Sequence, residues 1–99
     1  MKKYNIYEVR TTETPIQGVM FRGRIRKFCL GKRIDALVEN ATDIEGAVRF
    51  AVVGDGRSSE IADYVRTIAA DATVELVMEA VPNPVLSKLK VNDETRYNL

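Results

Sequence analysis

The chain contains no histidine, and this absence excludes more chemistry than any other feature of its 99 residues. The usual zinc sites are excluded, and so are nucleophilic sites of the Ser-His or Cys-His type. One cysteine, Cys29, cannot form a disulfide within the chain, and its position on the apolar face of a predicted helix fits a small buried hydrophobic residue.

Long apolar runs are also missing, and proline and glycine are scarce, with three and six residues respectively. The basic start Met1-Lys2-Lys3 leads into a mixed segment at residues 4–8 instead of an apolar one, so we expect neither a signal peptide nor a membrane span. No stretch has the composition of a linker. We therefore expect a single domain over residues 1–99, located in the cytoplasm, monomeric and without a membrane partner.

Acidic and basic residues are unevenly distributed along the chain, although the formal net charge is only +1. Residues 1–33 carry nine lysines and arginines against two acids, whereas residues 34–80 carry ten acids against three arginines. This asymmetry predicts one positive end of the molecule, suited to an anionic partner or substrate. A basic helix can equally be a solvated face, so charge alone names no ligand.

The hydrophobic pattern predicts an α+β fold. Apolar spacing of i, i+4, i+7 and i+8 from Phe21 predicts a helix that ends near residues 31–33, and a second helix is expected to begin at a Ser58 or Ser59 cap, with Ile61, Val65, Ile68 and Ala69 on its core face. Strands are expected at residues 5–9, 34–39, 47–53 and 73–79, with a further edge strand around Leu89 and Val91. This order predicts a ferredoxin-like βαββαβ sandwich, in which two helices pack on one face of an antiparallel sheet.

The segment from Thr14 to Arg22, which we call the anion loop, opens directly into the first helix. Backbone N–H groups at a helix start lack intrahelical partners and lie at the positive end of the helix dipole. Arg22 in the first turn is a cation at the positive end of the dipole, which is unfavourable. A bound phosphate or carboxylate would reverse this cost by accepting hydrogen bonds from the guanidinium of Arg22. These residues predict an anion site.

Residues 16–22 resemble the signature loop of the acylphosphatase family, a V-Q-G-V-x-F-R run that opens the first helix of that fold. A second segment, residues 37–43, resembles the family's W-V-x-N segment and the aspartate-containing hairpin that follows it. The separation of Arg22 from Asn40 is the one that the family shows, and the element order extends the resemblance over nearly the whole chain.

The resemblance implies a hydrolase that cleaves the carboxyl-phosphate bond of small acyl phosphates without metal or cofactor. Arg22 would bind the phosphate and Asn40 would orient the attacking water. The other phosphate-binding positions carried over are Gln17, Gly18, Val19, Met20 and Phe21, through their backbone N–H groups. The expected partner is an acyl phosphate or inorganic phosphate. Nucleic acid is not expected, because the third strand offers only Phe50 for base stacking.

Several positions depart from the family pattern and leave an alternative open. Thr14 stands where the family usually has glycine at the start of its loop, and Pro15 follows it. Ala36 and Leu37 replace glycine and tryptophan, and the connection after Asn40 is about two residues longer. The chain is therefore either an active, divergent acylphosphatase or a degenerate anion-binding or regulatory module. Asp43 and Glu45 are expected to be solvated in the polar hairpin, without a catalytic role.

Overall fold

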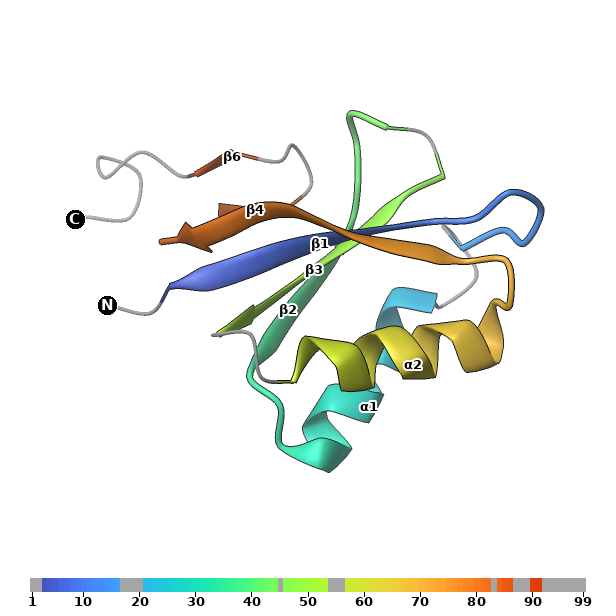
Figure 1. Ribbon diagram of the computed structural model, residues 1–99, viewed down its shortest axis with the longest axis horizontal. Helices are drawn as coiled ribbons and strands as arrows, with labels where there is room; N and C mark the ends of the chain where they lie inside the picture. Colours follow the sequence, from blue (N-terminus) through green and yellow to red (C-terminus); the bar gives the residue numbers. More distant parts are fainter. Residues whose placement is uncertain are drawn as a thin grey trace.

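The structure is a computed structural model that describes residues 3–16, 21–44, 46–53, 57–82, 84–86 and 90–91 (Figure 1). Its elements follow in the order β1 (Tyr4–Arg10), α1 (Phe21–Lys32), β2 (Ala36–Asn40), β3 (Val48–Val53), α2 (Ser58–Ile68), β4 (Thr73–Val81), β5 (Pro84–Val85) and β6 (Lys90–Val91). The predicted α+β class is confirmed.

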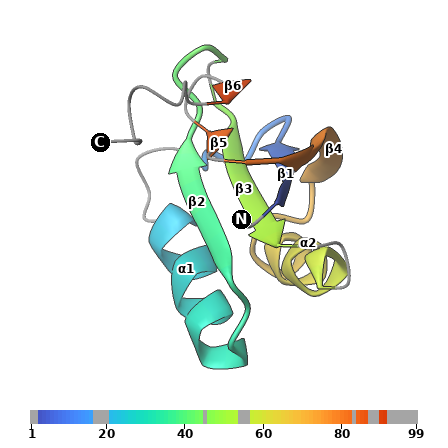
Figure 2. The ribbon, with the colours of Figure 1, turned by 90° about the vertical axis from the view of Figure 1, so that its left-hand side faces the viewer.

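Strands β1 to β4 form one antiparallel sheet in the order β2-β3-β1-β4. Both helices cover the same face of this sheet (Figures 1 and 2). The edge strand expected around Leu89 and Val91 is not part of this sheet: β6 pairs with β5 in a separate two-stranded sheet, and Leu89 lies outside the described residues. No helix in the described ranges is long and apolar enough to cross a membrane.

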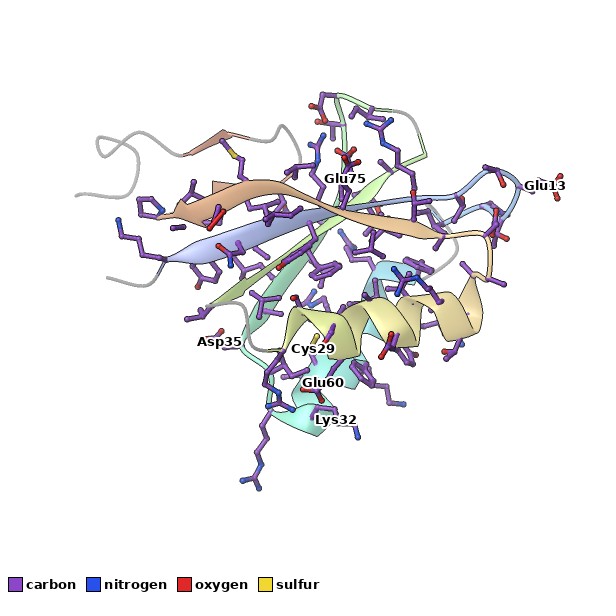
Figure 3. The ribbon with its side chains drawn as sticks, viewed as in Figure 1. Glu13, Cys29, Lys32, Asp35, Glu60 and Glu75 are labelled. Carbon is purple, nitrogen blue, oxygen red and sulfur yellow. The ribbon has the colours of Figure 1, made fainter. Side chains whose placement is uncertain are left out.

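The main core fills the space between the helices and the sheet. Its buried side chains come from both helices and from one face of β1 and β3, and include Val9, Phe21, Ile25, Cys29, Val48, Phe50, Val52, Ile61 and Val65. Each such side chain contributes about 1.5–3 kcal/mol by leaving water. Phe28 stacks on Tyr64 at 4.3 Å between ring centroids and so joins α1 to α2. The helix faces expected from apolar spacing are therefore the buried ones, and Cys29 lies inside, near α2 (Figure 3).

A second, smaller cluster covers the opposite face of the sheet. Leu86, just after β5, packs on Ile6 and Ala51, with Val77, Met78 and Val81 at its margin. Because of this cover, β3 is buried on both faces from Val48 to Val52, although its alternating sequence predicts a strand with one solvated face. Arg49, on the covered face, has no exposed surface.

Helix α1 ends at Lys32, within the range expected from the sequence. Arg33, not a glycine, takes the left-handed conformation after α1, with φ of 57°. The N–H groups of Arg33 and Ile34 donate to the carbonyls of Leu30 and Cys29 at 3.2 and 2.8 Å, which is the Schellman arrangement. At the start of α2 the expected serine cap is wrong, because the N-cap residue is Arg57 and makes no side-chain capping bond.

Strand β4 is longer than expected and irregular. It continues to Val81, directly before Pro82, and its pairing with β1 shifts register on either side of Ile6. Ala80, with φ of 53°, donates its N–H to Oδ1 of Asn5 at 2.8 Å. These shifts break the simple alternation predicted for the strand. Leu76, in the regularly paired part of this edge strand, is 45% exposed.

Candidate functional site

Helix α1 and strand β2 are neighbours that run in opposite directions, because only residues 33–35 connect them (Figure 2). The start of α1 and the end of β2 therefore lie at the same end of the molecule. Phe21 and Arg22 occupy the first two positions of α1, and Asn40 is the last residue of β2. The topology thus brings together the two parts of the chain to which sequence analysis assigned the chemistry.

Arg22 is exposed, and among the described residues it makes no ion pair. Arg26, one turn further along α1 on the same side of the helix, lines a hollow of about 370 Å³ together with residues 36–39 of β2. Because the two elements are antiparallel, one turn back from Arg26 leads toward the end of β2. Arg22 and Arg26 therefore share one side of α1, and Arg22 is the one nearer to the end of the helix that lies beside the end of β2.

Asn40 carries the one buried side-chain polar atom that lacks a hydrogen-bond partner within the described part of the chain, its Oδ1. Side chains alternate along a strand, so Asn40 shares the helix-covered face with Val38, which is part of the main core. A buried polar atom without a partner costs about 1–3 kcal/mol. The Oδ1 of Asn40 is therefore a buried acceptor without a partner in the described part of the chain, on the sheet face that α1 covers.

The anion loop is held by the core on both sides of its central residues. Ile16 and Phe21 are 1% and 4% exposed and belong to the same cluster. Since the Phe21 side chain is occupied by packing, only its backbone N–H is available to an anion. The other predicted phosphate-binding residues, Gln17, Gly18, Val19 and Met20, lie outside the described residues.

Residues 12–14, which lead into the anion loop and which we call the loop entry, are held by a carboxylate from a turn far away in the sequence. Asp71, between α2 and β4, accepts hydrogen bonds on Oδ2 from the backbone N–H groups of Thr12, Glu13 and Thr14 at 3.0, 2.7 and 3.0 Å. The hydroxyl of Thr14 donates to Oδ1 at 2.5 Å, and that of Thr12 to Oδ2 at 3.2 Å. The bond from the Thr14 hydroxyl, followed by those from the backbone, holds the pKa of Asp71 far below its usual range.

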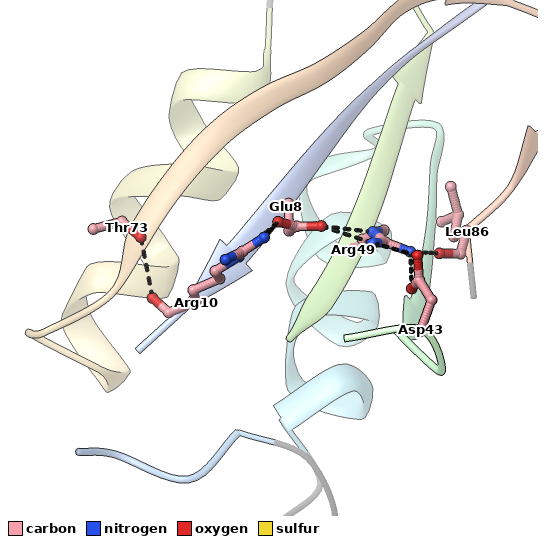
Figure 4. A network of polar contacts seen from close by, with 6 residues as sticks. All are labelled: Glu8, Arg10, Asp43, Arg49, Thr73 and Leu86. Atoms are coloured by element: carbon pink, nitrogen blue, oxygen red, sulfur yellow. Dashed lines mark hydrogen bonds and ion pairs between the residues drawn. The ribbon is translucent and has the colours of Figure 1, made fainter. Parts of the chain in front are cut away.

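A chain of charged side chains lies on the opposite face of the sheet (Figure 4). Oε2 of Glu8 accepts from Arg10, and Oε1 accepts from Arg49 at 2.8 and 2.9 Å. Arg49 also donates to both oxygens of Asp43 at 2.7 and 3.2 Å and to the carbonyl of Leu86 at 2.9 Å. The buried guanidinium therefore joins β1, β3, the β2–β3 hairpin and the segment after β5.

Asp43 is exposed, as expected for the hairpin, but it also pairs with the buried Arg49. Its side chain is 40% exposed but is paired with Arg49, and this hydrogen bond lowers the pKa of Asp43. For Arg49, burial works against the charged form, but the hydrogen bonds with Asp43 and Glu8 outweigh it and the pKa is raised. Glu45, the other acid expected to be solvated there, lies outside the described residues.

Sequence analysis missed Asp71, Arg49 and Glu8. Arg49 and Glu8 alternate with core residues in their strands, a pattern typical of strands with one solvated face. Nothing in the neighbouring sequence indicates that Leu86 packs on that face of the sheet. Asp71 is an ordinary turn residue by sequence. The run of polar residues at 11–14 was the one available hint that a partner would be needed for their donors.

A second hollow, of about 390 Å³, separates the anion-loop entry from the β2–β3 hairpin. It is lined by Arg10, Thr11, Thr12, Glu13, Thr14, Pro15, Ile16, Ile44 and Gly46. In the ranges described, no group of three or more cysteines and acids is placed to hold a metal ion. Comparisons of the chain with protein-family models, with curated proteins and with solved structures gave no match.

Proposed function

We propose that the chain is an acylphosphatase-like hydrolase of ferredoxin-like fold that cleaves the carboxyl-phosphate bond of small acyl phosphates in the cytoplasm. The observation that carries the proposal is the shared location of Arg22 and Asn40, at the start of α1 and the end of the antiparallel β2. The strand order β2-β3-β1-β4, with both helices on one face, supports the fold assignment, and β5 and β6 are additions to it.

In this proposal Arg22 and the backbone N–H groups of residues 17–21 bind the phosphate and neutralise its equatorial oxygens. Asn40 holds the attacking water in line with the carboxylate leaving group. An acyl phosphate has a good leaving group, so the water needs orientation more than a strong base. An amide can accept from and donate to one water molecule without titrating, and the unpartnered Oδ1 of Asn40 supports this role.

The test is hydrolysis of benzoyl phosphate in a chelator-containing buffer by the wild type, Arg22→Ala and Arg24→Ala. Arg24 is a matched control, because it is also exposed on α1 and has no ion pair within the described residues. We expect turnover by the wild type and by Arg24→Ala, and a loss of about 100-fold or more in kcat/KM for Arg22→Ala. Equal losses in the two variants would contradict the assignment.

The second candidate is an anion-binding or regulatory module without turnover. It is favoured by the way Thr14 is tied to Asp71 and by the seven residues, 41–47, between Asn40 and β3, which differ from the family's compact loop and hairpin. It predicts that inorganic phosphate binds while benzoyl phosphate is not hydrolysed above the background rate. Turnover that disappears in Arg22→Ala would eliminate this candidate.

A further inference from the structure

We infer that Asp71 is a positioning residue for the anion loop: its carboxylate preorganises the loop entry, residues 12–14, so that the backbone beyond Ile16 binds phosphate. The inference rests on the proposed function. Asp71 lies 49 positions after Arg22 in the sequence, on the turn between α2 and β4. In this inference Asp71 does not contact the phosphate itself.

The geometry of Asp71 is that of an anion in a nest of consecutive N–H groups. Three successive backbone donors, those of Thr12, Glu13 and Thr14, converge on one oxygen within 3.0 Å. The loop turns around this oxygen, while the side chain of Glu13 points away from the molecule at the loop tip (Figure 3). Without the carboxylate these three N–H groups would have no protein partner in the contacts described, and the turn would lose the group that defines it.

The Thr14 side chain completes the anchor. Its hydroxyl donates to Oδ1 of Asp71, and its carbonyl accepts from the hydroxyl of Thr11. Hydrogen bonds therefore hold Thr14 by both its side chain and its backbone, at the position where the acylphosphatase pattern has a glycine. Pro15 then restricts φ at the next position, and Ile16 enters the core.

The chain beyond Ile16 thus starts from a fixed point and reaches a second fixed point at Phe21. Ordering a loop when the ligand binds costs conformational entropy, so an entry that is already ordered leaves more of the binding energy for phosphate. Asp71 supplies this order from a turn that tolerates a negative charge, because its N–H partners satisfy the carboxylate and keep it ionised.

The inference predicts a specific kinetic signature for Asp71→Ala. A loosened loop weakens phosphate binding, so KM for benzoyl phosphate and Kd for inorganic phosphate should rise about tenfold, while kcat stays within about twofold because Asn40 is untouched. A purely structural role would lower the folded fraction and hence the apparent kcat, and would leave KM unchanged. The matched control is Asp63→Ala, because Asp63 is an exposed acid of α2 whose one ion pair within the described ranges is with Arg66 at 3.6 Å.

Two further variants keep the test decisive if Asp71→Ala does not fold. Asp71→Asn is isosteric and can keep Oδ1 on the three N–H groups while its amide donates to the Thr14 hydroxyl, so it should restore KM to within about threefold of wild type. Thr14→Val removes only the hydroxyl bond and should raise KM by about threefold. Unchanged KM in both Asp71→Ala and Thr14→Val would overturn the inference and leave the proposed function standing. A wild type that neither binds inorganic phosphate nor hydrolyses benzoyl phosphate would overturn both.

Discussion

Glu8 and Arg49 face each other directly across β1 and β3, with Nη2 of Arg49 2.8 Å from Oε1 of Glu8 and both side chains buried. The pair lies on the sheet face away from the helices, under Leu86. Buried charges are stable only when each has several partners, and Arg49 finds them in Glu8, Asp43 and a main-chain carbonyl.

Replacing Arg49 by methionine should destabilise the fold by about 3–5 kcal/mol, because Glu8 stays buried without the opposite charge that faces it. Urea unfolding monitored by circular dichroism measures this change. The double variant Glu8→Gln/Arg49→Met should be more stable than Arg49→Met alone, since it removes the remaining buried charge. A loss below about 1 kcal/mol for Arg49→Met would mean that the pair is not buried in solution.

Acid should destabilise the protein through Asp71, whose pKa is lowered in the folded state by the Thr14 hydroxyl and the loop N–H groups. The stability that this carboxylate contributes is fully present above the unfolded-state pKa of about 3.9 and is lost as the pH falls toward the lowered folded-state value. Between about pH 4 and pH 2, the free energy of unfolding should therefore fall more steeply for the wild type than for Asp71→Asn. Parallel curves would contradict the anchor.

The left-handed residue after α1 offers a stabilising substitution. Arg33 is exposed and has φ of 57°, a conformation that costs a non-glycine residue about 1–2 kcal/mol. Arg33→Gly should raise the free energy of unfolding by about 1 kcal/mol, whereas Arg33→Ala should bring no gain. Thermal unfolding of the three proteins measures the difference, and equal midpoints for Arg33→Gly and Arg33→Ala would contradict it.

The elements of the main sheet and both helices could be predicted from the sequence because their signals are local. Apolar spacing placed Phe21, Ile25 and Cys29 on the core face of α1, and alternation placed Val48 and Phe50 on the core face of β3. The strand β4 was located correctly, but its register shifts depend on the pairing with β1, which alternation does not encode.

The contacts on the sheet face away from the helices, and those of Asp71, could not be predicted, because they join residues that are far apart in the sequence. The buried Arg49 donates a hydrogen bond to the carbonyl of Leu86, 37 residues later, and Asp71 holds Thr14 across 57 residues. At the candidate site, Arg22 and Asn40 stay predictions, and the structure shows only that they lie at one end of the molecule. No pattern in the sequence indicates that Asp71 holds residues 12–14.

Asn40→Ala should separate stability from activity. Removing a buried amide whose Oδ1 has no partner among the described residues should leave the free energy of unfolding unchanged or raise it by about 1 kcal/mol. The same variant should bind inorganic phosphate like the wild type and lose about 100-fold or more in kcat for benzoyl phosphate. Retention of kcat would remove Asn40 from the mechanism.

The measurement that tests the central claim most directly is a titration of inorganic phosphate followed by backbone amide chemical shifts, with wild type, Arg22→Ala and Arg24→Ala compared at one ionic strength. We predict that phosphate shifts the amides of the anion loop and of Asn40 together, that Arg22→Ala weakens binding about tenfold or more, and that Arg24→Ala changes it by less than about twofold. Shifts spread along α1 that weaken equally in both variants would show nonspecific attraction to a basic helix and would contradict a phosphate site formed with Arg22.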